Sequence, residues 1–281
     1  MRKTAALLGA LLVGWGTVAA AATPVDDAVN RYFDLLPTPS QITAADTVPA
    51  VAWVERQAGR QSLWIARGSE RRLLQRYEDD GLPLTAVTLS PDASLVAYVR
   101  GTTPNGQGEV NNPLDLPDPQ ERVLWLVPTT GDTAARRVAG GPTSTLGNPA
   151  FSPNGQQLVW TSGKEVWGLK LATAAANPER LFTIRGSAAQ LAWSPDGRQL
   201  AFVSMRGTHS FVGTFDISSR ELRYFGASLE SDQLPAWSPN SRYLAFVRVP
   251  EEAQSYRFTP RMESIPWSIQ LADLRTGDVR T

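Results

Sequence analysis

Continuous runs of apolar residues recur along the chain, and a short polar turn motif precedes each run. The four clearest motifs are Ser-Pro-Asp or Ser-Pro-Asn tripeptides, which begin at Ser90, Ser152, Ser194 and Ser238. Proline presets φ for a turn, and the Asp or Asn side chain caps it. The apolar run that follows is typical of a strand buried on both faces. The sequence therefore predicts four hairpins, each with a buried second strand.

The spacing of the motifs fits one repeated unit. Their serines are 62, 42 and 44 residues apart, and the long first interval holds an insertion at residues 102–121. A period of 42 to 44 residues with about four strands per unit is typical of a β-propeller blade. We therefore expect an all-β propeller of four-stranded blades, built from WD40-like PD40 repeats. The insertion is interpreted as a solvated loop, with a reach to a partner as the alternative.

Further strands are expected around each hairpin. Third strands are predicted at residues 123–127, 165–171, 210–217 and 265–273, edge-like fourth strands at 136–139, 179–184 and 221–225, and an earlier repeat without its motif at 51–54 and 62–66. The count is about four and a half blades, and the last repeat stops just after its third strand. An open ring leaves strand edges exposed, so we expect a truncated propeller. The alternative is a small closed propeller whose last blade is completed by N-terminal residues.

The first 22 residues have the pattern of a secretory signal. Arg2 and Lys3 precede an apolar stretch, and residues 19–22 are alanines suited to cleavage just before Thr23. We expect an exported protein, periplasmic or secreted, without stable membrane insertion after cleavage. An uncleaved membrane anchor is the alternative.

A lead-in segment separates the signal from the repeats. Residues 25–36 place apolar side chains at helical spacing after two aspartates, which predicts a short amphipathic N-terminal helix. The expected organisation is a signal peptide at 1–22, the helix and lead-in at 23–45, and an incomplete propeller at 46–281.

The composition excludes several kinds of site. Lys and Arg together number 27, as do Asp and Glu, so no net charge attracts nucleic acid. Cysteine is absent, and His209 is the single histidine, which excludes thiolate chemistry and multi-histidine metal sites. The sequence has no Gly-x-Ser-x-Gly elbow and no phosphate-binding loop. We therefore expect no catalytic residue, no cofactor and no metal in this chain.

Four residues near predicted hairpin turns are candidates for contact with a substrate or partner: Arg206, His209, Glu251 and Glu252. An imidazole serves structural and ligand-binding roles equally, so a hydrogen bond from His209 to a neighbouring blade is the alternative there. The paired carboxylates of Glu251 and Glu252 are suited to holding the amino terminus of a peptide. Their alternative is a solvated loop tip.

The segments around His209 resemble one family of exported enzymes. They are Leu200-Ala201-Phe202-Val203-Ser204-x-Arg206-Gly207-x-His209-Ser210-Phe211, Asp232-x-x-Pro235-x-Trp237-Ser238-Pro239 and Pro266-Trp267-Ser268-Ile269. Together they look like the propeller of bacterial prolyl oligopeptidase-family serine peptidases, including the dipeptidyl aminopeptidase-like ones. The blade motifs alone also resemble TolB-type propellers.

The resemblance implies a role as well as a fold. In that family the propeller precedes a C-terminal α/β-hydrolase domain that bears the serine, aspartate and histidine, and it filters or positions peptide substrates. This chain ends before such a domain, so the resemblance implies a substrate-gating propeller that is not itself catalytic. The alternative is a stand-alone TolB-like periplasmic propeller that binds a protein or peptide partner at its mouth.

Overall fold

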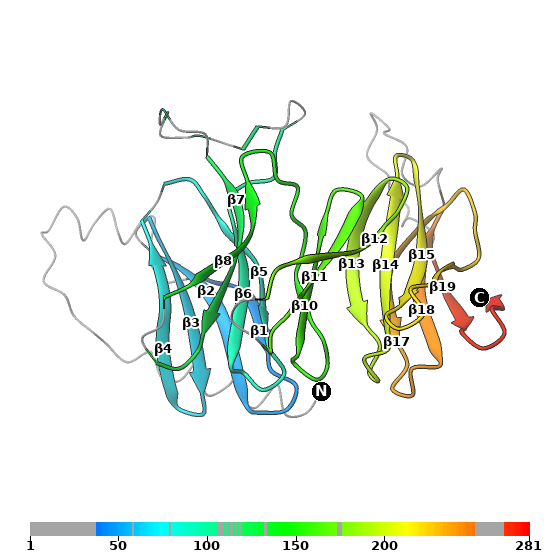
Figure 1. Ribbon diagram of the computed structural model, residues 1–281, viewed down its shortest axis with the longest axis horizontal. Coiled ribbons are helices and arrows are strands. Elements are labelled where there is room, and N and C mark those ends of the chain that lie inside the picture. The colour runs from blue at the N-terminus through cyan, green and yellow to red at the C-terminus, as the bar shows by residue number, and fades with distance from the viewer. Residues whose placement is uncertain are drawn as a thin grey trace, which may run out of the picture. The chain divides into compact units, whose positions relative to one another are not determined.

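The computed structural model describes residues 38–281 except for 58, 79, 106–108, 111, 113–114, 116, 118–119, 132–133, 173–175 and 251–266. The chain divides into two compact units on either side of the Ser144–Thr145 bond (Figure 1). The predicted secretory signal and the predicted N-terminal helix lie outside the described residues.

The first unit holds two four-stranded antiparallel sheets, in which each strand pairs with the next along the chain. Blade 1 consists of β1 (Thr38–Ala44), β2 (Ala50–Gln57), β3 (Arg60–Arg67) and β4 (Glu70–Tyr77). Blade 2 consists of β5 (Leu84–Leu89), β6 (Leu95–Arg100), β7 (Arg122–Pro128) and β8 (Arg136–Gly141). The first blade thus begins at Thr38, within the segment that the sequence assigned to the lead-in.

The second unit holds three more sheets of the same kind. Blade 3 consists of β9 (Ala150–Phe151), β10 (Gln157–Ser162), β11 (Glu165–Lys170) and β12 (Glu179–Thr183). Blade 4 consists of β13 (Ser187–Trp193), β14 (Gln199–Arg206), β15 (His209–Asp216) and β16 (Leu222–Tyr224). Blade 5 consists of β17 (Ser231–Trp237), β18 (Tyr243–Val249), β19 (Ser268–Asp273) and β20 (Val279–Arg280). A parallel bridge between Ser210 and Ser231 joins blades 4 and 5.

The described residues confirm the predicted all-β class, with no helix among them. Four-stranded antiparallel sheets follow the predicted repeats closely. The fifth repeat also has a short fourth strand, β20, which pairs with β19 and which the count of about four and a half blades did not include.

The repeated turn motif forms the same hydrogen bonds in four blades. In blade 4 the Ser194 hydroxyl donates to Asp196 Oδ1 at 2.6 Å and accepts the Gln199 amide at 2.9 Å. Asp196 Oδ1 also accepts the Arg198 amide at 3.1 Å. Equivalent bonds occur at Ser90, Ser152 and Ser238. The serine therefore closes the turn that separates the first two strands of each of these blades.

The apolar run after each turn supplies two separate cores. On β14, Phe202 packs with Phe182 of blade 3, and the two ring centroids lie 5.2 Å apart. The alternate residues Ala201 and Val203 pack in a second cluster with Phe246 of blade 5. Both faces of β14 are therefore buried, which explains why its sequence is continuously apolar.

A glutamine links the first strands of neighbouring blades in each unit. Gln190 and Leu234 lie at β-bulges with φ of 50° and 56°, and Gln190 Oε1 accepts the Leu234 amide at 2.6 Å. Gln41 and Ala86 repeat this arrangement in the first unit at 2.9 Å. The glutamine satisfies a backbone N–H that the bulge removes from the strand ladder.

Replacing Ser194 by alanine is expected to destabilise the chain by about 2 kcal/mol, because a buried amide and a carboxylate oxygen each lose a partner. Ser187→Ala is the matched control, since Ser187 is exposed at the start of β13. Urea unfolding followed by tryptophan fluorescence measures both changes. Equal stability of the two variants would contradict a structural role for the motif serine.

Acid is expected to weaken two of the four turns. The backbone amide of Ser94 lowers the pKa of Asp92. Burial opposes a lowered pKa at Asp196, but hydrogen bonds from Ser194 and Arg198 outweigh it. A carboxylate whose pKa is lower in the folded than in the unfolded chain stabilises the fold at any pH above its unfolded-state pKa, which is about 4. This stabilisation is lost as the pH falls through the pKa of the folded state.

The Asp92→Asn/Asp196→Asn variant is therefore expected to lose less stability than the native chain when the pH falls from about 5 to about 3. Asparagine already occupies this position at Asn154 and Asn240, so the turn accepts it without strain. Thermal unfolding at a series of pH values measures the difference. Parallel loss of Tm in both proteins would show that these carboxylates do not contribute.

Candidate functional site at the hairpin end of blade 4

The hairpin between β14 and β15 brings two of the predicted contact residues together. Arg206 and His209 are cross-strand partners at its end, and Gly207 occupies the turn with a φ of 76°. Both side chains are half-buried. Glu251 and Glu252 follow β18 at Val249 and lie outside the described residues.

Arg206 lies over two aromatic rings. Its guanidinium carbon is 4.6 Å from the centroid of Phe211 and 5.6 Å from that of Tyr224. Its Nε donates to Ser204 Oγ at 3.3 Å, whereas its two terminal nitrogens have no partner among the described residues. The contacts fix the plane of the guanidinium and leave its outer edge open.

The pleat of the sheet places these side chains on one face. Ser204 pairs with Phe211 across β14 and β15, and Tyr224 pairs with Gly213 across β15 and β16. Gly213 is required there, because a Cβ atom would lie 2.7 Å from Phe202 Cζ. This gap lets the Tyr224 ring meet Phe202 edge-on at 5.6 Å.

The His209 ring extends the same surface. Its centroid is 5.1 Å from that of Phe211, in an edge-on arrangement. The Thr208 hydroxyl lies 3.5 Å from His209 Nδ1. The imidazole therefore borders the aromatic rings on which Arg206 lies.

Two exposed, positively charged residues belong to segments that precede blade 4. Ser204 Oγ donates to the Arg185 carbonyl at 2.7 Å, which places the Arg185 backbone next to β14. The Ile184 amide donates to the Lys164 carbonyl at 2.9 Å, so Lys164 lies next to the same segment. The adjacent Glu165 is already paired with Arg180 at 3.0 Å.

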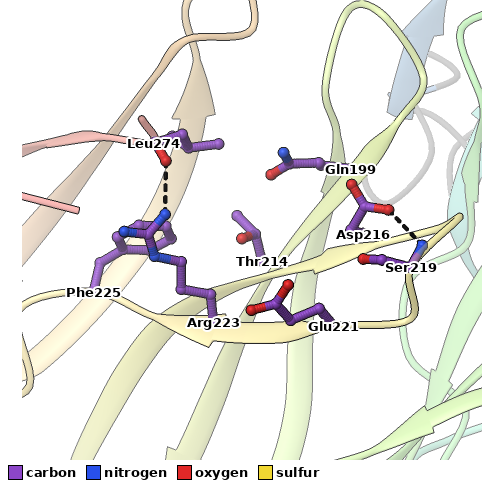
Figure 2. Close-up of a pocket in the computed structure, with 8 residues that line it drawn as sticks. All are labelled: Gln199, Thr214, Asp216, Ser219, Glu221, Arg223, Phe225 and Leu274. Atoms are coloured by element: carbon purple, nitrogen blue, oxygen red, sulfur yellow. Dashed lines mark hydrogen bonds between the residues drawn. The ribbon is translucent and has the colours of Figure 1, made fainter. Parts of the chain in front are cut away.

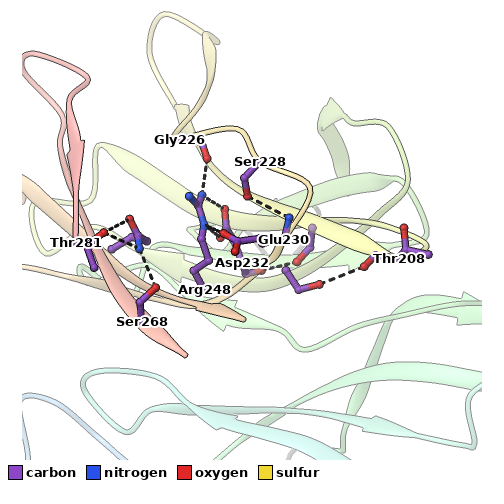
Figure 3. A network of polar contacts seen from close by, with 11 residues as sticks. Thr208, Gly226, Ser228, Glu230, Asp232, Arg248, Ser268 and Thr281 are labelled. Carbon is purple, nitrogen blue, oxygen red and sulfur yellow. Dashed lines mark hydrogen bonds and ion pairs between the residues drawn. The ribbon is translucent and has the colours of Figure 1, made fainter. Parts of the chain in front are cut away.

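A buried ion pair anchors the hairpin to blade 5 (Figure 3). Arg248 donates to both oxygens of the fully buried Asp232, at 2.7 and 2.9 Å, and also lies 3.5 Å from Glu230. Burial raises the pKa of Asp232, and the bond to Arg248 partly offsets that increase. The Ser210 hydroxyl donates to the Asp232 carbonyl at 2.6 Å, so the residue next to His209 is fixed on the next blade.

A small recess lies at the opposite ends of β14 and β15 (Figure 2). Its volume is about 130 Å³, and its lining includes Asp216, Glu221 and Arg223. Asp216 accepts the Ser218 and Ser219 amides, and Arg223 donates to the Leu274 carbonyl at 2.6 Å. These groups are engaged in local structure, so the hairpin end is the stronger candidate.

Within the described residues, no group of three or more His, Asp or Glu side chains is placed to hold a metal ion. The same described residues contain no helix that is long and apolar enough to cross a membrane.

Comparison with known proteins supports the fold. No family model matches the sequence, and no curated protein matches it. A TolB-type protein from Agrobacterium tumefaciens is 17% identical in sequence, with 87% of this chain and 80% of that chain covered and a TM-score of 0.52. A prolyl endopeptidase is 12% identical, with 85% and 33% covered and a TM-score of 0.57. The chain has the β-propeller fold.

Hydrazine synthase from Kuenenia stuttgartiensis also matches, at 13% identity, with 95% of this chain and 68% of that chain covered and a TM-score of 0.55. The sequence identity of this chain to each of these three proteins is low, and what it shares with them is the fold. The likeness therefore confirms the predicted resemblance to TolB and prolyl endopeptidase propellers at the level of the fold and does not select an activity.

Sequence reasoning found Arg206 and His209 but not the aromatic residues that orient them. Phe211 and Tyr224 are separated by a strand and a turn, and their shared face depends on the register of β15 and β16. Alternation along β15 from His209 would have indicated Phe211. The short β16 offers no such pattern for Tyr224.

Breaking the buried ion pair is expected to destabilise the chain strongly. Arg248→Met leaves the buried Asp232 carboxylate without its partner and is expected to cost about 3–5 kcal/mol. The double variant Asp232→Leu/Arg248→Met is expected to recover part of that loss. Arg242→Met, which breaks the more exposed pair with Asp273, is the matched control and should cost much less. Urea unfolding measures all three, and a small effect of Arg248→Met would contradict the anchoring role.

Proposed function

We propose that this chain is a non-catalytic, substrate-gating propeller region of an exported serine peptidase of the prolyl oligopeptidase type. The hairpin end of blade 4 is the face that contacts the peptide. The observation that carries the proposal is the half-buried Arg206, held over two aromatic rings, with no partner for its terminal N–H groups among the described residues.

The arrangement supports recognition rather than catalysis. Arginine and aromatic side chains are the residues most enriched at protein recognition sites. No nucleophilic elbow occurs in the sequence, so in this proposal hydrolysis belongs to a hydrolase domain encoded outside these 281 residues. Export directed by residues 1–22 is part of the same proposal.

The comparison with the prolyl endopeptidase is consistent with such a division of labour. This chain covers 33% of that protein, while 85% of this chain takes part in the match. A propeller of this size therefore accounts for a part of a longer peptidase.

A stand-alone TolB-like propeller that binds a protein or peptide partner is the second candidate. It is favoured by the extent of the match to the Agrobacterium protein, because 80% of that chain is covered. The candidates differ in what the gene encodes. Under the first, the reading frame continues past the Thr281 codon into a Gly-x-Ser-x-Gly elbow, whereas a stop codon followed by unrelated sequence favours the second.

Proline-containing peptides are expected to bind the purified chain saturably and to remain intact. Fluorescence anisotropy of a labelled peptide measures binding, and mass spectrometry checks that no bond is cleaved. A photoreactive phenylalanine analogue in the peptide is expected to crosslink to residues 204–211 or to Tyr224. Crosslinks confined to residues 216–221, at the other end of the blade, would overturn the proposal. The absence of saturable binding would overturn it as well.

A further inference from the structure

Five described arginines of the second unit lie near an aromatic ring. Four of them also bind a carbonyl or carboxylate with a terminal nitrogen or Nε. They are Arg220 with the Leu181 carbonyl, Arg223 with the Leu274 carbonyl, Arg242 with Asp273 and Arg248 with Asp232. Each is a structural link between strands or blades.

Arg206 differs from these four within the part of the second unit that the structure describes. It contacts Phe211, Tyr224 and Ser204, but its two terminal nitrogens bind neither a carbonyl nor a carboxylate. A guanidinium whose plane is fixed and whose fork is free is preorganised to take an anion with two parallel hydrogen bonds.

Local charge favours an anion as well. Arg185, whose carbonyl accepts the Ser204 hydroxyl, and Lys164, whose carbonyl accepts the Ile184 amide, are positively charged and exposed. Two acidic side chains among the described residues of blades 3 and 5 are paired with other arginines, Glu165 with Arg180 and Glu230 with Arg248. Neither of these two carboxylates therefore competes for the Arg206 fork.

Close packing supports the stem of Arg206. Gly186 lies against it, because a Cβ atom at that position would be 3.2 Å from Arg206 Cγ and 2.0 Å from the Met205 carbonyl oxygen. The left-handed φ of 75° at Gly186 also favours glycine. A bulkier residue there would displace the guanidinium from its rings.

We infer that Arg206 anchors a carboxylate of the bound peptide, with the exposed Tyr224 ring beside it to receive an adjacent apolar side chain. This inference rests on the proposed function and specifies its ligand. A carboxylate can come from the free C-terminus of the peptide or from an acidic side chain. Both offer the same planar pair of oxygens to the guanidinium.

The test uses one labelled proline-containing peptide in three forms. The neutral form has an amidated C-terminus and an internal Gln. The second form has a free C-terminus and the same Gln, and the third has an amidated C-terminus with Glu in place of Gln. At least one of the two acidic forms is expected to bind the native chain about tenfold more tightly than the neutral form. The tighter of the two identifies the source of the carboxylate.

Arg206→Gln is expected to abolish this preference, so that the acidic and neutral forms bind this variant with equal affinity. Arg206→Lys keeps the charge but lacks the fork, and it should retain only part of the preference. Arg275→Gln is the matched control, since it removes one exposed positive charge at the opposite end of blade 5 and should preserve the preference. Far-UV circular dichroism and Tm establish that each variant is folded.

The outcomes separate the two proposals. If all three peptides bind the native chain equally, the carboxylate anchor is wrong and the peptide-binding function stands. The anchor is also wrong if Arg275→Gln loses the preference as Arg206→Gln does, or if Arg206→Gln keeps it. If no form binds, the proposed function itself fails.

Discussion

A sheet that is apolar on both faces is stable only when a neighbour covers each face. Blade 4 meets this requirement within the second unit, where Phe202 and Phe215 pack toward blade 3 and Val203 and Val212 pack toward blade 5. The same constraint explains the runs of apolar residues in the sequence. It also sets where chemistry can occur, because polar side chains with free groups are excluded from the covered faces and gather at the strand ends.

The hairpin of blade 4 is one such strand end, and its rigidity comes from both neighbours. Gly186 and the Arg185 carbonyl hold it from the segment that follows blade 3. Ser210 and the buried Asp232 hold it from blade 5. A recognition group supported in this way loses little conformational freedom when a ligand binds, which favours affinity.

Much of the fold follows from local signals that the sequence displays openly. Each Ser-Pro-Asp or Ser-Pro-Asn motif carries its own hydrogen-bonding partners, so the turn can be predicted from five or six residues. The short strand β20 was not predicted, because two residues give no periodicity. The bulges at Gln190 and Leu234 were missed for another reason. The amide of Leu234, which has a positive φ, is bound by Gln190 of the preceding blade, and nothing local in the sequence indicates this.

The candidate site shows the same division. The position of Arg206 and His209 at a hairpin follows from the strand pattern. What sets Arg206 apart from Arg220 or Arg248 is the absence of an acceptor for its fork in the described structure, and that depends on residues distant in the chain. Composition and spacing carry no information about it.

The order of strands within the blades has a consequence for how the chain reaches its fold. Every described sheet is a meander, in which each strand pairs mainly with the one made just before it. Closing such a hairpin requires only a short loop, so little chain entropy is lost before the first contacts form. Pairing of strands within a blade therefore depends on contacts that are near in sequence, whereas covering its two apolar faces requires the neighbouring blades.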